Sequence, residues 1–314
     1  MLLASTQKGV ALITALLIVA LATVISVELG TRLQLDIRRT SNIITSDQAL
    51  LYMMEAEYWS RRILKADRDD NNYDHLDEDW AMEIPPLPVE GGSIQGKLSD
   101  LQACFNLNSL YQAGAVNTLA QDRFKRLMQQ LSTPPSTDLS QAVIDWIDNE
   151  ADIITSIPDG AEDGYYLNLE WPYRNANQAI KSISELRLIK GFEENSIIEE
   201  SEDWLCAFGP AANINVNTAP TEVLESLAAG ISETVAADII ANRQTAPYET
   251  MNDFLTINNL STILTDTNGL SVNSDYFLLE TEAKIGPART LMYSIIQREG
   301  DGNTKVISRS QGAY

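Results

Sequence analysis

The sequence is poor in histidine, cysteine and basic residues, and each shortage excludes a class of function. Its 314 residues include one histidine, His75, and no Cys-x-x-Cys pair or cysteine–histidine cluster. A zinc site or a Ser-His-Asp triad built from a local motif is therefore unsupported. Basic residues number 22 against 44 acidic ones, a formal net charge of −22. This charge repels phosphate backbones and argues against nucleic-acid partners, whereas it favours hard cations that take carboxylate oxygens as ligands.

Two cysteines, Cys104 and Cys206, leave two readings open. An even pair in an oxidising compartment suggests one disulfide, and the alternative is a pair of buried free thiols. The length allows one large domain or two modest ones, with enough chain for a substantial core.

The N-terminus contains a long apolar run. Residues 10–27 hold 18 amino acids without a charge, enough to cross a bilayer. An ordinary signal peptide is cut after such a run, near small residues, and the candidates for that cut are weak. Instead Gly9 follows Lys8 directly before the run. This layout is typical of a prepilin-type leader, residues 1–9, that is cut on the cytoplasmic side and leaves Val10 as the mature N-terminus.

The helical pattern continues beyond the apolar run. Apolar residues recur at roughly helical spacing as far as Leu64, and no proline falls between Val10 and Asp67. We predict one long helix over residues 10–66, about 85 Å long at about 1.5 Å per residue. A helix that is apolar at one end and amphipathic at the other suits a subunit that packs beside similar helices.

Several segments resemble, in order and spacing, the minor pseudopilin K family of type II secretion systems. The resemblance runs from about residue 8 to residue 255, and the segments that carry it are KGVALITALLIVALATV, SDQALLYMMEAEYW, GGSIQGKLSDLQACFNLNSL, AVIDWIDNEAD, GAEDGYY, PYRNAN, SISELRLIKGF and INVNTAPTEVLESL. It implies a non-enzymatic subunit in the inner membrane, with most of the chain in the periplasm. Its implied partners are prepilin peptidase, other minor pseudopilins, the major pseudopilin and the inner-membrane assembly platform. Methylation of Val10 would follow cleavage by the peptidase.

The fold implied by this resemblance is α+β. A pilin-like long N-terminal helix would pack on a small antiparallel sheet, formed by residues 93–106 and 272–299, with a large helical insertion over residues 107–271. Alternating residues after position 93 and strand-like runs after position 275 agree with this division. Residues 67–92 are rich in turn formers and are expected to form a solvated loop. Their EF-hand-like start lacks the glycine and the glutamate that calcium binding requires.

Thr14 marks a departure from most pseudopilins, which carry glutamate at this position of the mature chain. That glutamate is thought to pair with the N-terminal ammonium of a neighbouring subunit, and burying a carboxylate in a membrane without a partner is costly. A subunit at the tip has no neighbour ahead of it, so Thr14 is consistent with a tip position. The alternative is a tolerated polar residue in the helix.

An acidic segment, AVIDWIDNEADIITSIPDGAEDGYY, holds the candidate metal ligands. Its carboxylates would repel one another if they met without a cation, and calcium takes six to eight oxygens. The resemblance implies calcium in the helical domain, which we assign to Asp148, Glu150, Asp152, Glu162 and Asp163, with Asn177 as a further ligand. A hydrated acidic loop is the alternative.

Residues 214–255 resemble a helix-hairpin-helix unit. Asn217 or Thr218 can cap a first helix, and Gly230 ends it before a second helix begins near Ser232. Such units often hold DNA phosphates through backbone N–H groups, but Ser232 stands where a second glycine would help, and Glu225 and Glu233 lie close by. Packing or partner contact is therefore favoured over DNA binding.

The preferred function is a minor pseudopilin that starts or caps a pseudopilus for protein export across the outer membrane. A minor pilin of a type IV pilus and a membrane-anchored periplasmic calcium-binding module are the alternatives in related classes. A membrane-tethered hydrolase using Asp145 and Asp148 is disfavoured, because no nucleophile–base arrangement accompanies them.

Overall fold

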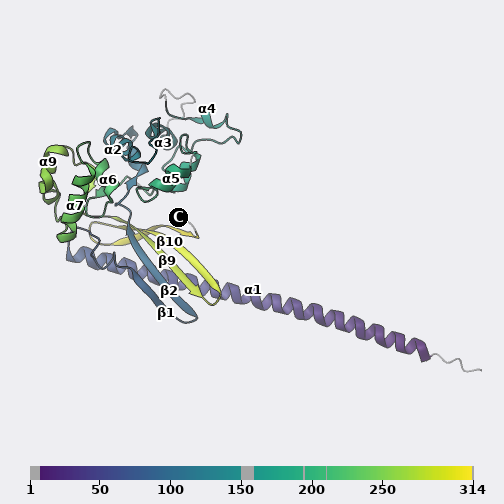
Figure 1. Cartoon of the computed structure of the whole chain (residues 1–314). Helices are drawn as coiled ribbons and strands as arrows, with labels where there is room; N and C mark the ends of the chain where they lie inside the picture. The colour runs from purple at the N-terminus through teal and green to yellow at the C-terminus, as the bar shows by residue number, and fades with distance from the viewer. Residues whose placement is uncertain (1–7, 150–158, 194, 210, 313–314) are drawn as a thin grey trace, which may run out of the picture.

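The computed structural model describes residues 8–149, 159–193, 195–209 and 211–312. Figure 1 shows three parts: a long helix, a sheet that lies against one half of it, and a helical domain on the far side of the sheet from that helix. This arrangement is the α+β, pseudopilin-like architecture that the resemblance implied.

The long helix, α1, covers Lys8–Asp70 and has 63 residues, about 95 Å at about 1.5 Å per residue. Residues 9–44 are exposed over their whole circumference and extend away from the rest of the molecule (Figure 1). The second half packs on the sheet through Ala49, Met53 and Leu64, which are fully buried. Their spacing of four and eleven residues places them on one face of the helix.

The sheet has five antiparallel strands in the order β1-β2-β9-β10-β11. The strands are β1 (Ile84–Val89), β2 (Gly92–Asp100), β9 (Tyr276–Ile285), β10 (Ala288–Arg298) and β11 (Thr304–Gln311). Side chains from the sheet meet α1 in two apolar clusters, one around Met53, Ile94 and Met292, the other around Leu64, Trp80 and Phe277.

The sheet differs from the sequence-based expectation at both edges. Strand β1 lies within residues 67–92, so the expectation of a solvated loop there is wrong, and α1 itself continues to Asp70. Strand β11 lies beyond residue 299, where the expected sheet ended. Residues 105–106 belong to a separate short pairing, in which β3 (Phe105–Asn106) runs parallel to β6 (Leu205–Cys206).

The helical domain is inserted between β2 and β9, which are neighbours in the sheet. Its α-helices are α2 (Thr118–Met128), α3 (Leu139–Ile147), α4 (Asp163–Tyr166), α5 (Asn195–Ser201), α6 (Thr221–Ser226), α7 (Glu233–Thr245), α8 (Met251–Thr256) and α9 (Leu260–Ile263). A single apolar core joins them and includes Phe124, Trp146, Tyr166 and Phe254, each 3% exposed or less.

A disulfide joins Cys104 and Cys206, whose Cα atoms lie 5.8 Å apart. Cys104 follows the end of β2, and Cys206 is the last residue of β6, so the bond ties the helical domain to the sheet at its base.

Candidate functional site

The membrane-anchor candidate is the free half of α1. Among the described residues, α1 is the helix with the length and apolar composition to cross a membrane. Gly9 and Val10 lie in its first turn, and Val10 is exposed. Thr14 donates a hydrogen bond from Oγ1 to the Ala11 carbonyl, 3.0 Å away. Its hydroxyl is therefore satisfied within the helix, so no partner subunit is needed to bury it.

A cluster of three carboxylates lies in the helical domain. Oxygen atoms of Asp145, Asp148 and Glu162 all lie within 4.8 Å of one another. Asp145 and Asp148 are one turn apart at the end of α3, which places them on the same face. Glu162 directly precedes α4 and brings the third carboxylate back to them.

Several oxygens of this region are buried without hydrogen-bond partners. They are Asp145 Oδ2, Asn175 Oδ1 and Asn177 Oδ1. The amide of Asn175 is held in place, because its Nδ2 donates to Glu162 Oε2 at 2.7 Å and to the Asp145 carbonyl at 3.1 Å. Gly160 packs directly against the Asp145 carboxylate, since a Cβ at position 160 would lie 2.0 Å from Asp145 Oδ2. The oxygens of Asp145 and Asn175 that lack donors adjoin the clustered carboxylates, which fits an oxygen-ligated cation such as calcium.

The electrostatics of the cluster point the same way. Burial, together with the nearby charges of Asp145 and Asp148, raises the pKa of Glu162 to about 7. Burial also raises the pKa of Asp145, against the opposing effects of a hydrogen bond from the Ala161 backbone and the charge of Lys190. In the described chain, no ion pair joins Asp145 or Glu162 to a basic side chain. A divalent cation would supply the missing positive charge.

The ligands expected from the sequence are found in different places. The structure brings together Asp148 and Glu162. Asp163 lies outside this cluster, since its Oδ2 is 3.6 Å from Arg174 Nη1 and its Oδ1 accepts a hydrogen bond from the Asn175 backbone. Glu150 and Asp152 lie outside the described residues.

Two residues of the cluster were not among the expected ligands. Asp145 stands three residues before Asp148 on α3, so helical spacing could have placed both carboxylates on one face. Asn175 stands two residues before Asn177, and nothing in the sequence distinguishes the two amides.

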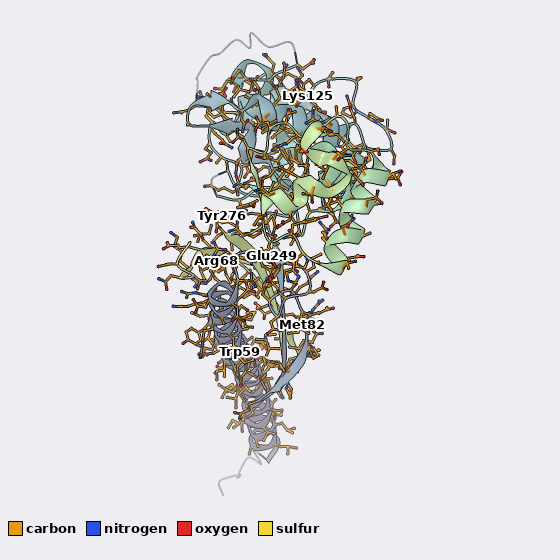
Figure 2. All side chains as sticks on the ribbon, turned by 90° about the vertical axis from the view of Figure 1, so that its left-hand side faces the viewer. Trp59, Arg68, Met82, Lys125, Glu249 and Tyr276 are labelled. Atoms are coloured by element: carbon orange, nitrogen blue, oxygen red, sulfur yellow. A yellow bond between two sulfur atoms is a disulfide. The ribbon has the colours of Figure 1, made fainter. Side chains whose placement is uncertain are left out.

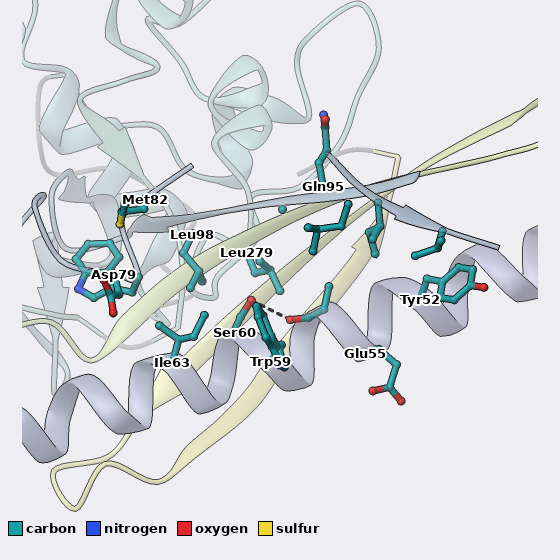
Figure 3. A pocket seen from close by; sticks show the side chains of 16 residues that line it. Tyr52, Glu55, Trp59, Ser60, Ile63, Asp79, Met82, Gln95, Leu98 and Leu279 are labelled. Carbon is teal, nitrogen blue, oxygen red and sulfur yellow. Dashed lines mark hydrogen bonds between the residues drawn. The ribbon is translucent and has the colours of Figure 1, made fainter. Parts of the chain in front are cut away.

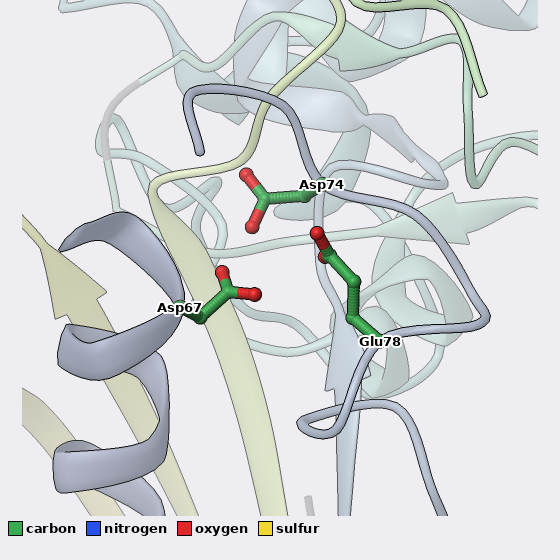
Figure 4. Close-up of side chains that lie close together, drawn as sticks. All are labelled: Asp67, Asp74 and Glu78. Carbon is green, nitrogen blue, oxygen red and sulfur yellow. The ribbon is translucent and has the colours of Figure 1, made fainter. Parts of the chain in front are cut away.

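A second acidic cluster, Asp67, Asp74 and Glu78, lies where α1 ends (Figure 4). Here the protein supplies the positive charge itself. Arg298, 1% exposed at the end of β10, places Nη1 2.8 Å from Asp67 Oδ2 and also pairs with Asp74. Glu78 accepts hydrogen bonds from Trp80 Nε1 at 2.6 Å and from the His75 backbone at 3.0 Å. This cluster is structural, because its carboxylates already have donors.

The long helix, the five-stranded sheet and the inserted helical domain together define a pilin-like subunit, whose apolar helix is compatible with a single-pass membrane anchor. Two family models described as type II secretion system (T2SS), protein K, match residues 103–210 and 214–273. Protein K of Aeromonas hydrophila is 31% identical over 98% of this chain and 97% of its own length. Protein K of Pseudomonas aeruginosa is 33% identical over 98% of this chain and 93% of its own length. The chain belongs to the type II secretion system protein K family.

A solved structure agrees with this assignment. The chain is similar, with a TM-score of 0.75 and 27% identity, to a chain in the GspK-GspI-GspJ complex of enterotoxigenic Escherichia coli; the match covers 88% of this chain and 100% of that one. The predicted function of a minor pseudopilin in type II secretion is confirmed, and the type IV pilin and unrelated calcium-module alternatives are not favoured.

Proposed function

We propose that this chain forms the tip of the pseudopilus, anchored in the inner membrane by α1 with its sheet and helical domain in the periplasm. The observation that carries this proposal is the position of the helical domain. It lies at the end of the molecule opposite the free, apolar half of α1 (Figure 1). A subunit that stacked above this one would meet that domain instead of a second helix, so the filament would end here.

The tip position is tested by labelling the helical domain. A gold-conjugated antibody fragment against this domain should mark isolated pseudopili at one end only. Labels along the shaft would contradict the proposal. An antibody fragment against the major pseudopilin is the control, since it should label the whole length.

Cleavage and assembly complete the proposal. Prepilin peptidase would cut between Gly9 and Val10, and Val10 would be methylated. The subunit would then join other minor pseudopilins, which the complex of the Escherichia coli relative supports, with the major pseudopilin and the assembly platform below. Mass spectrometry of the membrane-extracted chain should find a methylated Val10 at its start. An intact Met1, or a start beyond Val27, would overturn this step.

Calcium is proposed as the cation of the helical domain. Asp145, Asp148 and Glu162 would hold it, with Asn175 or Asn177 supplying amide oxygens. Bound calcium would neutralise mutual carboxylate repulsion and tie α3 to the start of α4. Isothermal titration of the full-length chain in detergent should show calcium binding, and Asp145→Asn with Glu162→Gln should remove it. Unchanged binding by the double variant would place the ion elsewhere.

The α6–α7 hairpin is proposed as a packing unit that binds no DNA. Its turn approaches α9 closely, because a Cβ on Gly230 would lie 2.7 Å from Ile263. Burial raises the pKa of Glu225, and the nearby charge of Glu233 acts in the same direction. Both features favour a protein neighbour over a phosphate.

A further inference from the structure

An apolar groove runs between α1 and the hairpin of β1 and β2 (Figure 3). Its volume is about 230 Å³, enough for one or two large side chains. The α1 residues that line it are three, four, seven, eight and eleven positions after the first, so they form one face of the helix. They are Tyr52, Glu55, Ala56, Trp59, Ser60 and Ile63. The groove therefore follows the axis of α1 for about three turns.

The groove exists because small residues meet across it. Ile94, Gly96 and Leu98 occupy alternate positions of β2 on the face toward α1, and Gly96 contributes no side chain. Ala56 and Ser60 line the same space from the helix. The gap is not forced by crowding at Gly96, since a Cβ there would find its nearest neighbours at 3.6–3.8 Å.

Large apolar side chains stand exposed at the mouth of the groove. Trp59 is 58% exposed and Met82 is 60% exposed. Figure 2 shows both in the half of the molecule that holds α1 and the sheet, away from the helical domain. Exposed tryptophan and methionine beside an unfilled apolar pocket are typical of protein interfaces, where such residues supply much of the binding energy.

We propose that this groove is the docking site for the long helix of another minor pseudopilin, which inserts a large apolar side chain against Gly96 beside Trp59. The inference rests on the proposed assembly with minor pseudopilins and specifies the surface involved. The direction of the groove favours a helix, because a subunit anchored in the same membrane would run alongside α1. A lipid tail is disfavoured, because Trp59 lies about 48 Å along the helix from Val27, where the apolar run ends.

Charge narrows the choice of partner. Glu55 and Asp79, both exposed, stand at the rim of the groove. The chain as a whole has a net charge of −22, so a second copy would bring further negative charge to an acidic rim. The inserted side chain is therefore expected to be flanked by lysine or arginine on the partner helix.

Single substitutions can fill the groove or remove the exposed tryptophan at its mouth without changing the core. Gly96→Leu should plug it, and Trp59→Ala should remove the aromatic wall. The full-length chain is co-expressed with the I-type and J-type minor pseudopilins of its own secretion system, and their recovery from detergent extracts is quantified. Each variant should lower recovery by about tenfold or more. Trp171→Ala is the matched control, since Trp171 is 80% exposed on the helical domain and should leave recovery unchanged.

Thermal unfolding separates loss of docking from loss of fold. Gly96→Leu should leave the unfolding midpoint unchanged or raise it, because an interior strand glycine gains a packed side chain. A photo-reactive benzoylphenylalanine at position 82 should cross-link to a minor pseudopilin. Cross-linking to a second copy, an exported protein or lipid would overturn the proposal.

The outcomes also separate this inference from the proposed assembly. If the wild-type chain recovers its partners and both variants do so equally, the groove is not the docking site, although the assembly stands. If the wild-type chain recovers neither partner, the assembly itself fails, and the groove proposal fails with it.

Discussion

The two acidic clusters of this protein are similar in composition but differ in whether a basic side chain pairs with them. At the end of α1, Asp67 and Asp74 share the buried guanidinium of Arg298. In the helical domain, Asp145 and Glu162 have no described ion pair, and Asp145 Oδ2 is buried without a donor. The first cluster holds three segments of the chain together, and the second leaves room for an external cation.

The comparison shows that clustered carboxylates do not by themselves identify a metal site. In both clusters, one oxygen of each carboxylate lies within 4.8 Å of the others. What differs is whether the fold has already supplied donors and positive charge. Buried charge must be compensated in either case, so the informative feature is that no basic side chain forms a described ion pair with Asp145 or Glu162.

Removing Arg298 should produce the largest effect. Arg298→Met leaves Asp67 and Asp74 without their cationic partner, which should lower the free energy of unfolding by about 3–5 kcal/mol. Denaturant titration of the full-length chain in detergent measures this loss. Arg289→Met lies on the same strand, but its guanidinium is exposed and its partner Glu282 also pairs with Lys284, so this change should cost less stability. A loss no larger than this control would show that Arg298 does not compensate the cluster.

Removing calcium should have the next largest effect, through the helical domain. At a free calcium concentration about 100-fold above Kd, binding should stabilise the folded state by about 2.7 kcal/mol, and chelation should remove this. Thermal unfolding with and without chelator measures the difference. Magnesium is the control ion, because it demands stricter octahedral geometry. If neither ion changes the unfolding midpoint, the cluster binds no calcium and the segment is a hydrated acidic loop.

The pH dependence of stability should distinguish the clusters more finely. The folded pKa of Glu162, about 7, is higher than its usual 4.5, so the folded state holds a proton that the unfolded state releases. In chelator, stability should therefore fall as pH rises from about 5 to about 7. Calcium should flatten this part of the curve. Because the raised pKa values of Asp67 and Asp100 act under both conditions, the difference between the two curves isolates the helical domain.

The variant Glu162→Gln is the check on that assignment. It should make the curve in chelator resemble the curve in calcium. If the difference between the curves survives this change, another group is responsible for it.

Asp163→Asn should have the smallest effect. Asp163 pairs with Arg174 at the surface and lies outside the cluster, so its loss should cost less than about 1 kcal/mol and leave calcium affinity within about twofold. Titration calorimetry tests this. A tenfold loss of affinity would instead make Asp163 a ligand, as the sequence pattern predicted.

Much of the fold could be predicted because its signals are local. Eighteen uncharged residues indicate the candidate anchor, the absence of proline extends the helix, and strand-like runs identify β9 and β10. Strand β1 escaped prediction because Pro85, Pro86 and Pro88 read as loop formers. An edge strand tolerates them, since its outer N–H groups need no partner. Strand β11 is largely exposed and polar, so it carries little apolar signal.

The candidate site was predicted less well for a different reason. The acidic run marks the right region, but a carboxylate's partner depends on which distant segment folds against it. Asp163 meets Arg174, whereas Asp145, one turn before Asp148, is covered by Asn175 and Gly160. Arg298 is more than two hundred residues from Asp67 and Asp74 in the chain, and no local pattern links them.

The disulfide at the base of the helical domain also has a mechanical consequence. Both ends of that domain leave the sheet side by side, since Asp100 pairs with Phe277 on neighbouring strands. The bond between Cys104 and Cys206 fastens a third segment of the domain, β6, to the connection that follows β2. A force applied along α1 would therefore reach the helical domain through two chain connections and a cross-linked segment. The domain would then move together with the sheet instead of rotating about a single hinge.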